Sequence, residues 1–313
     1  MATIWTMGEL LVEIMRPVAD MPLEQIGTFV GPFPSGAPAI FIDTVARLGH
    51  GAGIIGCVGD DAFGRCVLNR LQTDGVDVRL VSVDSDETTA CAFVTYSGDG
   101  SREFIFHLSH TAAVKAAAPK ELPGSGCAYF HIMGCSLMSH PDFYRRILDT
   151  AGMFHQAGAL ISFDPNIRPE LLRHCDLDET VEPVLSKCDI LLPGLEELKL
   201  LTGMNSMESA VDHVFQRYPV RVIALKLGKD GCEIITRQHR FIKGVYPIVP
   251  KDATGAGDCF DAAFLCGLVE GLPIERCADM ASAAAALNTA AFGPMEGDIS
   301  PNTVAALQAA GKV

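Results

Sequence analysis

Short apolar runs alternate with amphipathic helical patterns along most of the sequence, and this alternation limits the folds open to the chain. The runs TIWTMG, GIIGCVG, ALISFDPN, CDILLPG and VIALKLG have the character of buried strands, and each ends at or beside proline or glycine. PAIFIDTVARLG has apolar residues at helical spacing and ends at Gly49, and FGRCVLNRLQTDG has the same pattern and ends at Gly75. Strands that alternate with helices predict right-handed β–α–β units and a mostly parallel sheet.

Two stretches interrupt this alternation. Residues about 11–34 contain the strand-like segments LVEIM and TFVGPF with no helix between them. Residues about 88–110 have the pattern of a β-hairpin that turns at the SGDG sequence of residues 97–100. Two antiparallel excursions from an α/β core predict a small accessory sheet that covers a site as a lid, with an ordinary edge hairpin as the alternative. We expect a single domain over residues 1–313, with these lid strands inserted into the core.

The composition is informative about partners and location. The chain has 313 residues, of which 49% are hydrophobic, and this is ample for a large core. A net charge of −14 argues against a general nucleic-acid binder, although a small anionic ligand could still occupy a local basic pocket. The 11 cysteines include no CxxC pair, which favours free thiols in a reducing cytoplasm.

Neither the N-terminal segment nor the most apolar stretch of the sequence indicates a membrane segment. The N-terminal MATIWTMGELLVEI lacks the basic and apolar regions of a signal peptide. The most apolar stretch, MASAAAALNTAAFG, is too short and too polar to span a bilayer. We therefore expect a cytoplasmic protein with neither a membrane nor a nucleic-acid partner.

The segment KDATGAGDCFDAAF, residues 251–264, places glycine-rich backbone directly before a helix and a carboxylate in its first turn. Phe260, Phe264 and Leu268 follow at helical spacing, and the helix is expected to end near Gly271. The first N–H groups of a helix have no intrahelical partner, and with the helix dipole they form an anion site. Glycine has no Cβ, so the backbone can approach a phosphate closely.

These features suit phosphoryl transfer, which depends on positioning and electrostatic stabilisation. The backbone from Thr254 to Gly257 can direct N–H groups at a phosphoryl group, and Asp258 is placed to accept a proton from an attacking hydroxyl. The alternative is a glycine-rich turn followed by an acidic residue that the helix dipole favours.

Two other patterns carry less weight. GAGIIG, residues 51–56, matches GxGxxG but follows a helix and enters a strand, which is the reverse of the dinucleotide-binding order. His107 and His110 lie in a strand-like segment, so a polar pocket wall is favoured over a metal-binding pair.

DATGAGD resembles the second signature motif of the ribokinase (PfkB) family of carbohydrate kinases, and the resemblance extends over nearly the whole chain. GELLVEI resembles the first strand of that family, PSGAPAIFIDTVARLG its first motif, and CVGDDAFGRCVLNRLQTDGVD the segment after it. FDPNIRPELL, LLPGLEELKLLTG and LKLGKDG follow in the family's order. The resemblance implies an ATP-dependent kinase of a sugar hydroxyl. It also implies a ribokinase-like, Rossmann-type α/β core of three layers, with a mostly parallel central sheet and a small β-sheet lid.

The resemblance assigns residues to catalysis, to metal ions and to the nucleotide. Asp258 matches the catalytic base, and Gly255, Ala256 and Gly257 match the anion hole. Asp252 and Thr254 lie where members often hold a monovalent cation such as K⁺ or orient the anion hole. Glu197 remains from a magnesium-linked N-x-x-E motif in which Gly194 replaces the asparagine. The nucleotide candidates are Lys226, Gly228 and Gly231 of KLGKDG, and Asn288 in a helix that flanks the adenine pocket of relatives.

The sugar contacts implied by the resemblance come from several segments. The candidates are Glu13, Gly36, Ala37, Ile40, His107, Asn166 and Arg168. Glu13 stands where many members have a sugar-binding aspartate, and Ile40 stands where relatives usually have a sugar-binding asparagine. The hydroxyl pattern of the substrate is therefore expected to differ, and Asp43, one helical turn later, is a candidate to compensate. His107, on the lid hairpin, is expected to face the sugar.

The expected substrate is a ketohexose such as tagatose or fructose, phosphorylated with ATP and Mg²⁺. GPFPSGAPAIFID resembles bacterial kinases assigned to tagatose or related ketohexoses more than it resembles fructokinases. 2-Keto-3-deoxygluconate is an alternative, because its kinases share the GE…E opening and DPN-x-R, and Arg168 would pair with its carboxylate.

Two further alternatives remain open, and one expectation concerns assembly. A nucleoside kinase of the same fold would use Phe104 and Phe106 to clamp the base, and a non-catalytic relative would sense sugar or nucleotide.

Exposed strand edges invite pairing, and relatives often dimerise by clasping two lids. We therefore expect a homodimer through the lid.

Overall fold

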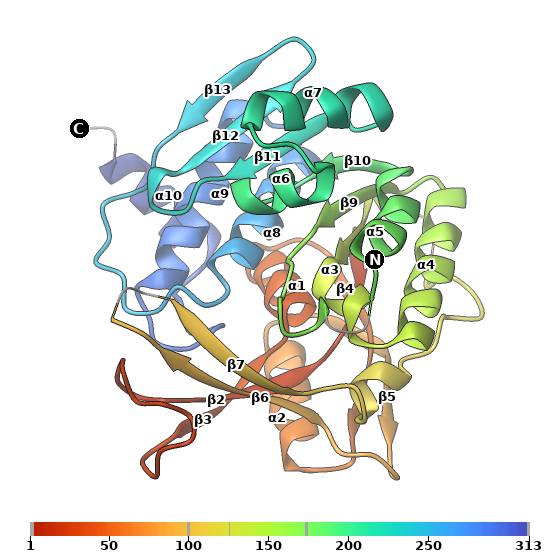
Figure 1. Cartoon of the computed structure of the whole chain (residues 1–313), viewed down its shortest axis with the longest axis vertical. Helices are drawn as coiled ribbons and strands as arrows, with labels where there is room; N and C mark the ends of the chain where they lie inside the picture. The colour runs from red at the N-terminus through yellow and green to blue at the C-terminus, as the bar shows by residue number, and fades with distance from the viewer. Residues whose placement is uncertain (1–2, 99–100, 125, 173–174, 312–313) are drawn as a thin grey trace.

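The computed structural model describes the whole chain apart from residues 1–2, 99–100, 125, 173–174 and 312–313 (Figure 1). Within the described residues, nine strands form a large sheet in the order β13-β12-β11-β10-β9-β8-β1-β4-β5. The strands are β1 (Ile4–Met7), β4 (Ala52–Gly59), β5 (Asp77–Asp84), β8 (Tyr129–Met133), β9 (Leu160–Asp164), β10 (Cys188–Leu191), β11 (Val222–Lys226), β12 (Cys232–Thr236) and β13 (Arg240–Lys243). Neighbours from β5 to β11 pair in parallel, and β12 and β13 add an antiparallel edge. The predicted mostly parallel sheet is confirmed.

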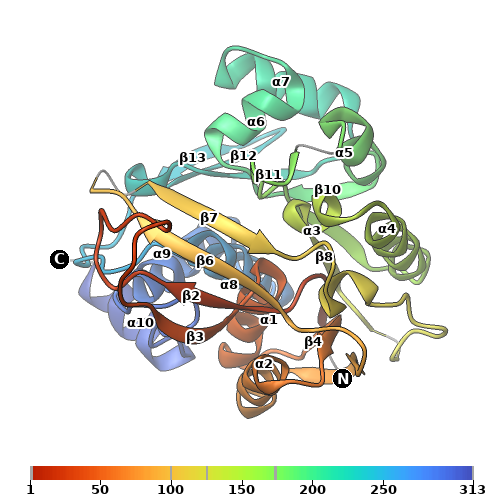
Figure 2. The ribbon, with the colours of Figure 1, turned by 60° about the horizontal axis from the view of Figure 1, so that its bottom comes forward.

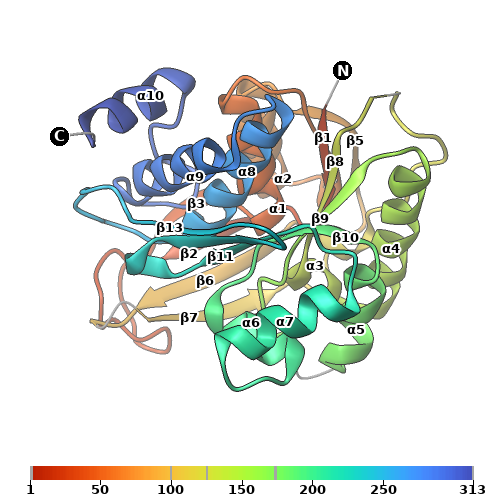
Figure 3. The same cartoon turned by 90° about the horizontal axis from the view of Figure 1, so that it is seen from above.

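Helices cover both faces of this sheet and complete three layers. Figure 3 shows α8, α9 and α10 with α1 and α2 on one side, and α3 to α7 on the other. Each side has its own buried apolar cluster, as expected for parallel strands buried on both faces. The helices are α1 (Ala37–Arg47), α2 (Ala62–Thr73), α3 (Gly134–Ser139), α4 (Pro141–Gln156), α5 (Leu177–Leu185), α6 (Leu195–Thr202), α7 (Met207–Arg217), α8 (Ala256–Val269), α9 (Ile274–Thr289) and α10 (Pro301–Ala310).

A second, four-stranded sheet has the order β3-β2-β6-β7 and lies beside α1 and α2 (Figure 2). Its strands are β2 (Leu11–Met15), β3 (Val30–Ser35), β6 (Ala90–Tyr96) and β7 (Arg102–His107). They arise from the two stretches that interrupt the β–α alternation, so the predicted accessory sheet is confirmed. Asp99 and Gly100, from the expected hairpin turn, lie outside the described residues. We call this element the small sheet.

Two expectations from the composition can be compared with the structure. All cysteines are free thiols. In the described ranges, no helix has the length and apolar character needed to cross a membrane. Pairing of two small sheets in a homodimer and a cytoplasmic location stay predictions.

Helix α8 is the buried centre of one layer, and its packing generates a stability prediction. The Phe264 side chain has 0% of its surface exposed, whereas Val249, in the loop before α8, is 86% exposed. Phe264→Ala is expected to lower the free energy of unfolding by about 3–5 kcal/mol, because it leaves a cavity. Val249→Ala, the control, is expected to change it by less than about 0.5 kcal/mol. Denaturant unfolding measures both, and equal effects would contradict this account of the core.

Candidate active site

The start of α8 is built on a glycine in the left-handed region. Gly255 caps the helix with φ of 77°, and a Cβ at this position would lie 2.6 Å from the Pro294 carbonyl oxygen. The Cys259 N–H donates to the Gly255 carbonyl at 2.9 Å, which is the first bond of the helical ladder. The N–H groups of Gly257 and Asp258 precede that bond and have no acceptor further back in the helix. They are therefore available to an anion.

The loop before the cap is fixed by hydrogen bonds to its backbone. Asp252 accepts the Thr254 N–H at 2.8 Å through Oδ1 and the Gly293 N–H at 2.9 Å through Oδ2. Asn288 Nδ2 donates to the Thr254 carbonyl at 2.7 Å. These bonds fix the backbone of Asp252 and Thr254 directly before Gly255, and the two roles that the resemblance implied for these residues stay predictions. The Asn288 side chain therefore also holds this loop, and its expected contribution to a nucleotide pocket stays a prediction.

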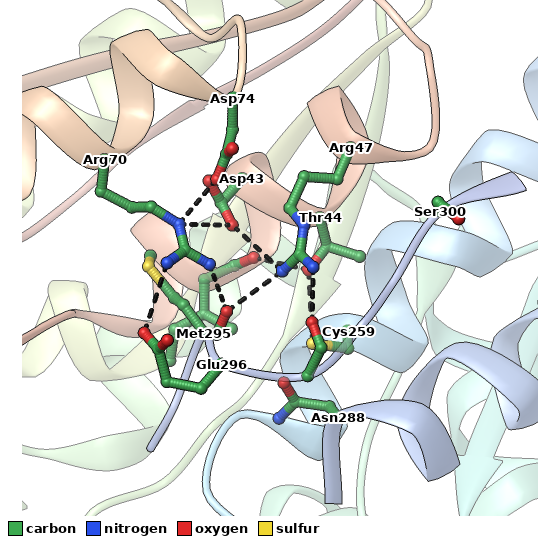
Figure 4. Close-up of polar contacts among 12 residues, drawn as sticks. Asp43, Thr44, Arg47, Arg70, Asp74, Cys259, Asn288, Met295, Glu296 and Ser300 are labelled. Carbon is green, nitrogen blue, oxygen red and sulfur yellow. Dashed lines mark hydrogen bonds and ion pairs between the residues drawn. The ribbon is translucent and has the colours of Figure 1, made fainter. Parts of the chain in front are cut away.

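Two arginines bind the backbone of the segment that follows Gly293 (Figure 4). Arg47 of α1 donates to the Met295 carbonyl at 3.0 Å and to the Gly297 carbonyl. Arg70 of α2 donates to the same Met295 carbonyl. These arginines fix the backbone that supports the anion-hole loop.

Asp43 belongs to this support and not to the sugar site. Its carboxylate is 1% exposed and lies 3.8 Å from Arg47 Nη1 and 3.8 Å from Arg70 Nε. The expectation that Asp43 replaces a lost sugar contact near Ile40 is wrong. The two residues are three apart on α1, but Ile40 faces the pocket, whereas Asp43 faces α2 and the Met295 segment.

Asp258, in the first turn of α8, has the properties of a proton acceptor. It is 5% exposed, and Asn166 Nδ2 donates to its Oδ1 at 3.2 Å. Burial raises the pKa of Asp258 to about 7, and the charge of Asp164 acts in the same direction. Arg168 and Lys226 oppose this increase. A carboxylate that titrates near neutral pH is suited to general base catalysis.

Asp258 stands in the wall between two pockets. The residues that both pockets share are Arg102, Asn166, Arg168, Gly255 and Asp258. The first, which we call the acceptor pocket, extends between α1 and the small sheet. The second, which we call the phosphate pocket, extends along Gly257 and Lys226. A group in one pocket can therefore reach a group in the other beside the carboxylate.

Most of the predicted sugar residues meet in the acceptor pocket. Its lining includes Glu13, Gly36, Ala37, Ile40, Asn166 and Arg168. Glu13 accepts the Ser35 hydroxyl at 2.7 Å through Oε1, and its Oε2 has no partner within the described residues. Burial raises the pKa of Glu13 to about 7. Ile40 is 3% exposed and belongs both to the pocket lining and to the core.

His107 is not brought to this pocket. Side chains of β7 alternate, so that Arg102, Phe104 and Phe106 line the acceptor pocket while Ile105 and His107 lie on the exposed face. The expectation that His107 faces the sugar therefore does not match the geometry, because its position differs from each of these inward-facing positions by an odd number.

Two residues of the acceptor pocket were missed by the sequence reasoning. Arg102 of β7 lines both pockets, and the period-two pattern of REFIFH was the signal that could have found it. Glu9 is 4% exposed and accepts hydrogen bonds from the Ser136 hydroxyl and the Cys135 thiol. Its position beside Gly8 gave no signal of burial.

Charged residues dominate the phosphate pocket. Lys226 Nζ donates to Asp164 at 2.7 Å and to Asp261 at 3.1 Å, and it lies at the end of β11 beside Gly257. Glu197 accepts the Ile167 N–H at 2.8 Å and the Gly194 N–H at 2.7 Å.

Glycine in place of asparagine at position 194 has a local consequence for Glu197. Two of the nucleotide candidates, in another segment, form a turn. A Cβ on Gly194 would lie 3.1 Å from Glu197 Oε2, so glycine lets this carboxylate fold back onto its own helix start. Gly228 and Gly231, with φ of 58° and 95°, form the turn after Lys226 but do not line the phosphate pocket.

A proton acceptor placed between two pockets, next to free N–H groups at a helix start, is the arrangement of a kinase that phosphorylates an alcohol. Residues 6–301 match the family described as pfkB family carbohydrate kinase, and the chain belongs to this family. It is a carbohydrate kinase with the ribokinase-like fold, so the resemblance seen in the sequence is confirmed.

Named relatives agree with this membership. The chain is 36% identical to fructokinase-1 of Oryza sativa subsp. japonica, over 84% of this chain and 82% of the relative. It is 31% identical to a fructokinase of Klebsiella pneumoniae, over 93% and 94%. A crystal structure of a candidate ribokinase II from E. coli, in complex with ATP and Mg²⁺, has a TM-score of 0.90 and 38% identity over 98% of this chain and 99% of that chain.

The two glycines of the anion hole are expected to fail in different ways. Gly255→Ala should lower the free energy of unfolding by at least about 1–2 kcal/mol, the cost of a left-handed conformation, because the new methyl group also meets Pro294. A Cβ on Gly257 lies 3.6 Å from Lys226 Nζ, which is an ordinary contact. Gly257→Val should therefore keep the fold but lower kcat by roughly 100-fold, the scale of one lost oxyanion-hole donor. Melting curves and turnover measure both, and an active Gly257→Val variant would contradict the phosphate site.

Proposed function

We propose that this chain transfers the γ-phosphoryl group of ATP to a hydroxyl of a ketohexose, with fructose or tagatose as the acceptor. The observation that carries the proposal is the buried Asp258 carboxylate between the acceptor pocket and the phosphate pocket. The names of the relatives, fructokinases of rice and Klebsiella, support a ketohexose. The ATP and Mg²⁺ in the related ribokinase II structure support the phosphoryl donor.

The reaction uses the residues of the shared wall in sequence. The acceptor hydroxyl lies against Asp258, which takes its proton as the oxygen attacks the γ-phosphorus. The bond from the γ-phosphorus to the oxygen that bridges it to the β-phosphate breaks at the same time, and ADP leaves with that oxygen and its electron pair. Negative charge on the phosphoryl oxygens is stabilised by the free N–H groups of Gly257 and Asp258 and by the helix dipole. The guanidinium groups of Arg102 and Arg168, which line both pockets, add positive charge on the acceptor side. Asp258 then holds the proton until the product leaves.

The phosphate pocket suits a magnesium nucleotide. In the described part of the chain, no group of three or more His, Cys, Asp or Glu side chains is arranged to hold a bare metal ion. Mg²⁺ usually keeps several waters and binds one or two carboxylates together with substrate phosphates. Asp164 and Glu197 are the carboxylates that would hold it, and it would neutralise phosphate charge when bound. A monovalent cation at Asp252 would share oxygens that already accept hydrogen bonds.

An acidic sugar is the second candidate, and the arginines favour it. 2-Keto-3-deoxygluconate carries a carboxylate, and both Arg102 and Arg168 line the acceptor pocket. Guanidinium groups bind carboxylates through paired hydrogen bonds. The stacked pair Phe104 and Phe106, with centroids 5.2 Å apart, is the feature that a nucleoside would use.

A substrate panel tests the proposal directly. Fructose, tagatose, 2-keto-3-deoxygluconate and adenosine would each be mixed with ATP and Mg²⁺, and release of ADP would be followed. The expected result is the highest kcat/KM with one of the two ketohexoses. Faster turnover of the acid or the nucleoside would replace the proposed substrate, and no turnover of any compound would overturn the proposed reaction.

The role of Asp258 generates a prediction for one variant and for the pH profile. Asp258→Asn is expected to lower kcat by roughly 10²–10⁴-fold, the scale of a general base. Only the deprotonated carboxylate accepts a proton, so wild-type kcat/KM should fall about tenfold per pH unit below the pKa of about 7 and level off above it. Steady-state kinetics between pH 5 and 9 would check both. A variant that retains most of its kcat would exclude Asp258 as the base.

Ile40 generates a prediction about substrate choice. It stands in the acceptor pocket where it can accept no hydrogen bond from a sugar hydroxyl. Tagatose and fructose differ only in the configuration at C4, so Ile40→Asn is expected to shift the ratio of kcat/KM toward fructose by several-fold, in line with ~1 kcal/mol for one hydrogen bond. Kinetics with both sugars and a melting curve on the same variant measure this. An unchanged ratio with a lower melting temperature would show that Ile40 acts only in the core.

A further inference from the structure

The small sheet is hydrogen-bonded directly to the anion-hole loop. The Tyr96 hydroxyl, at the end of β6, lies 2.7 Å from Asp252 Oδ1 and 2.8 Å from Thr254 Oγ1. A carboxylate only accepts, so Tyr96 donates to Asp252 and the Thr254 hydroxyl donates to Tyr96. Arg102, at the start of β7, donates to the Thr254 hydroxyl at 3.4 Å. Tyr96 and Arg102 thus connect the β6–β7 hairpin to the anion-hole loop through hydrogen bonds.

The two residues that Tyr96 contacts are those that set the start of α8. Asp252 and Thr254 bond to each other through the Thr254 N–H, and the Thr254 carbonyl is held by Asn288. Gly255 follows directly and carries the positive φ on which the free N–H groups depend. A shift of Asp252 or Thr254 would therefore move the anion hole.

The same small sheet forms one wall of the acceptor pocket. Glu13 on β2 is paired with Ala92 on β6, the strand that ends at Tyr96. Arg102 and Phe104 on β7 line the pocket as well. Strands joined by ladder hydrogen bonds move together, so an acceptor that contacts Glu13 or Arg102 also fixes the strand that carries Tyr96.

We propose that Tyr96 is a positioning residue that couples occupancy of the acceptor pocket to the geometry of the anion hole. The inference rests on the proposed function, because it assigns the acceptor pocket to the sugar and the helix start to the phosphoryl group. The ring centroids of Tyr96 and Phe292 are 6.5 Å apart, and a phenylalanine in place of Tyr96 would retain that contact.

Tyr96→Phe removes only the hydroxyl, and Tyr218→Phe is the matched control. The Tyr218 hydroxyl also donates to a carboxylate, that of Glu182 at 2.6 Å, but it lies outside both pockets. Calorimetric titration with a non-hydrolysable ATP analogue would be run with and without saturating sugar. In the wild type the sugar is expected to tighten the nucleotide about tenfold, a typical coupling between sites. Tyr96→Phe is expected to reduce that factor to below about threefold and to lower kcat about tenfold, the loss of one hydrogen bond.

Steady-state kinetics and a double variant separate positioning from simple structural loss. The KM for sugar should change less than twofold in Tyr96→Phe, and the melting temperature should match that of Tyr218→Phe. Thr254→Val, which removes the partner hydroxyl, should lower kcat similarly. The double variant should lose less than the sum of the two single variants, because the bond between the Tyr96 and Thr254 hydroxyls is already lost in each of them.

The outcomes distinguish the inference from the function on which it rests. If wild-type protein phosphorylates no compound of the panel, the proposed function fails. If the wild type is active and Tyr96→Phe keeps both its kcat and its coupling factor, the positioning role is overturned. Fully additive losses in the double variant would also overturn it, because they would show that Tyr96 and Thr254 act independently.

Discussion

The site depends on one backbone constraint, which is that α8 must begin with N–H groups that no protein group occupies. Unpaired backbone N–H groups are costly to bury, so the other polar groups of the loop need hydrogen-bond partners. Asp252 and Asn288 form hydrogen bonds with the backbone of the loop before Gly255. The arginines of α1 and α2 donate hydrogen bonds to carbonyls of the segment next to that loop. The Pro294 carbonyl leaves room for no Cβ at the cap. The glycine motif works because three separate parts of the chain hold it in place.

The electrostatics of the site follow from the same burial. Lys226 forms ion pairs with both Asp164 and Asp261. The negative charge of Asp164 and the nearby positive charges both affect the pKa of Asp258. Burial and the charge of Asp164 raise the pKa of Asp258 to about 7, and Arg168 and Lys226 oppose this increase. Under the proposed function, Arg168 and Lys226 therefore act both on the phosphoryl group and on the basicity of Asp258, and a substitution at either is expected to change both.

Much of the fold could be predicted because buried parallel strands are short apolar runs bounded by glycine or proline. Asp258 and its glycines could be predicted because a helix start has a sequence signature. The orientation of single side chains could not. His107 and Arg102 lie on one strand, and the burial of one face of β7 decides which of them points inward. The surroundings of Asp43 and Asn288 could not be predicted either, because Arg70 and the Thr254 carbonyl come from other segments of the chain that no local pattern reveals. Buried Glu9 depends on Ser136 in the same way.

Ile40 has a place in the molecule that constrains how the enzyme can diversify. Its side chain lines the acceptor pocket, and its Cγ2 would lie 3.0 Å from a Cβ on Gly255, so it packs against the cap of the catalytic helix. A change at this position would alter the lining of the acceptor pocket and, through the same contact, the backbone at the start of α8. Selection for a new acceptor through Ile40 would therefore act on turnover as well. Compensating changes are expected to accumulate first in the segment around Pro294, whose carbonyl oxygen lies against the same glycine.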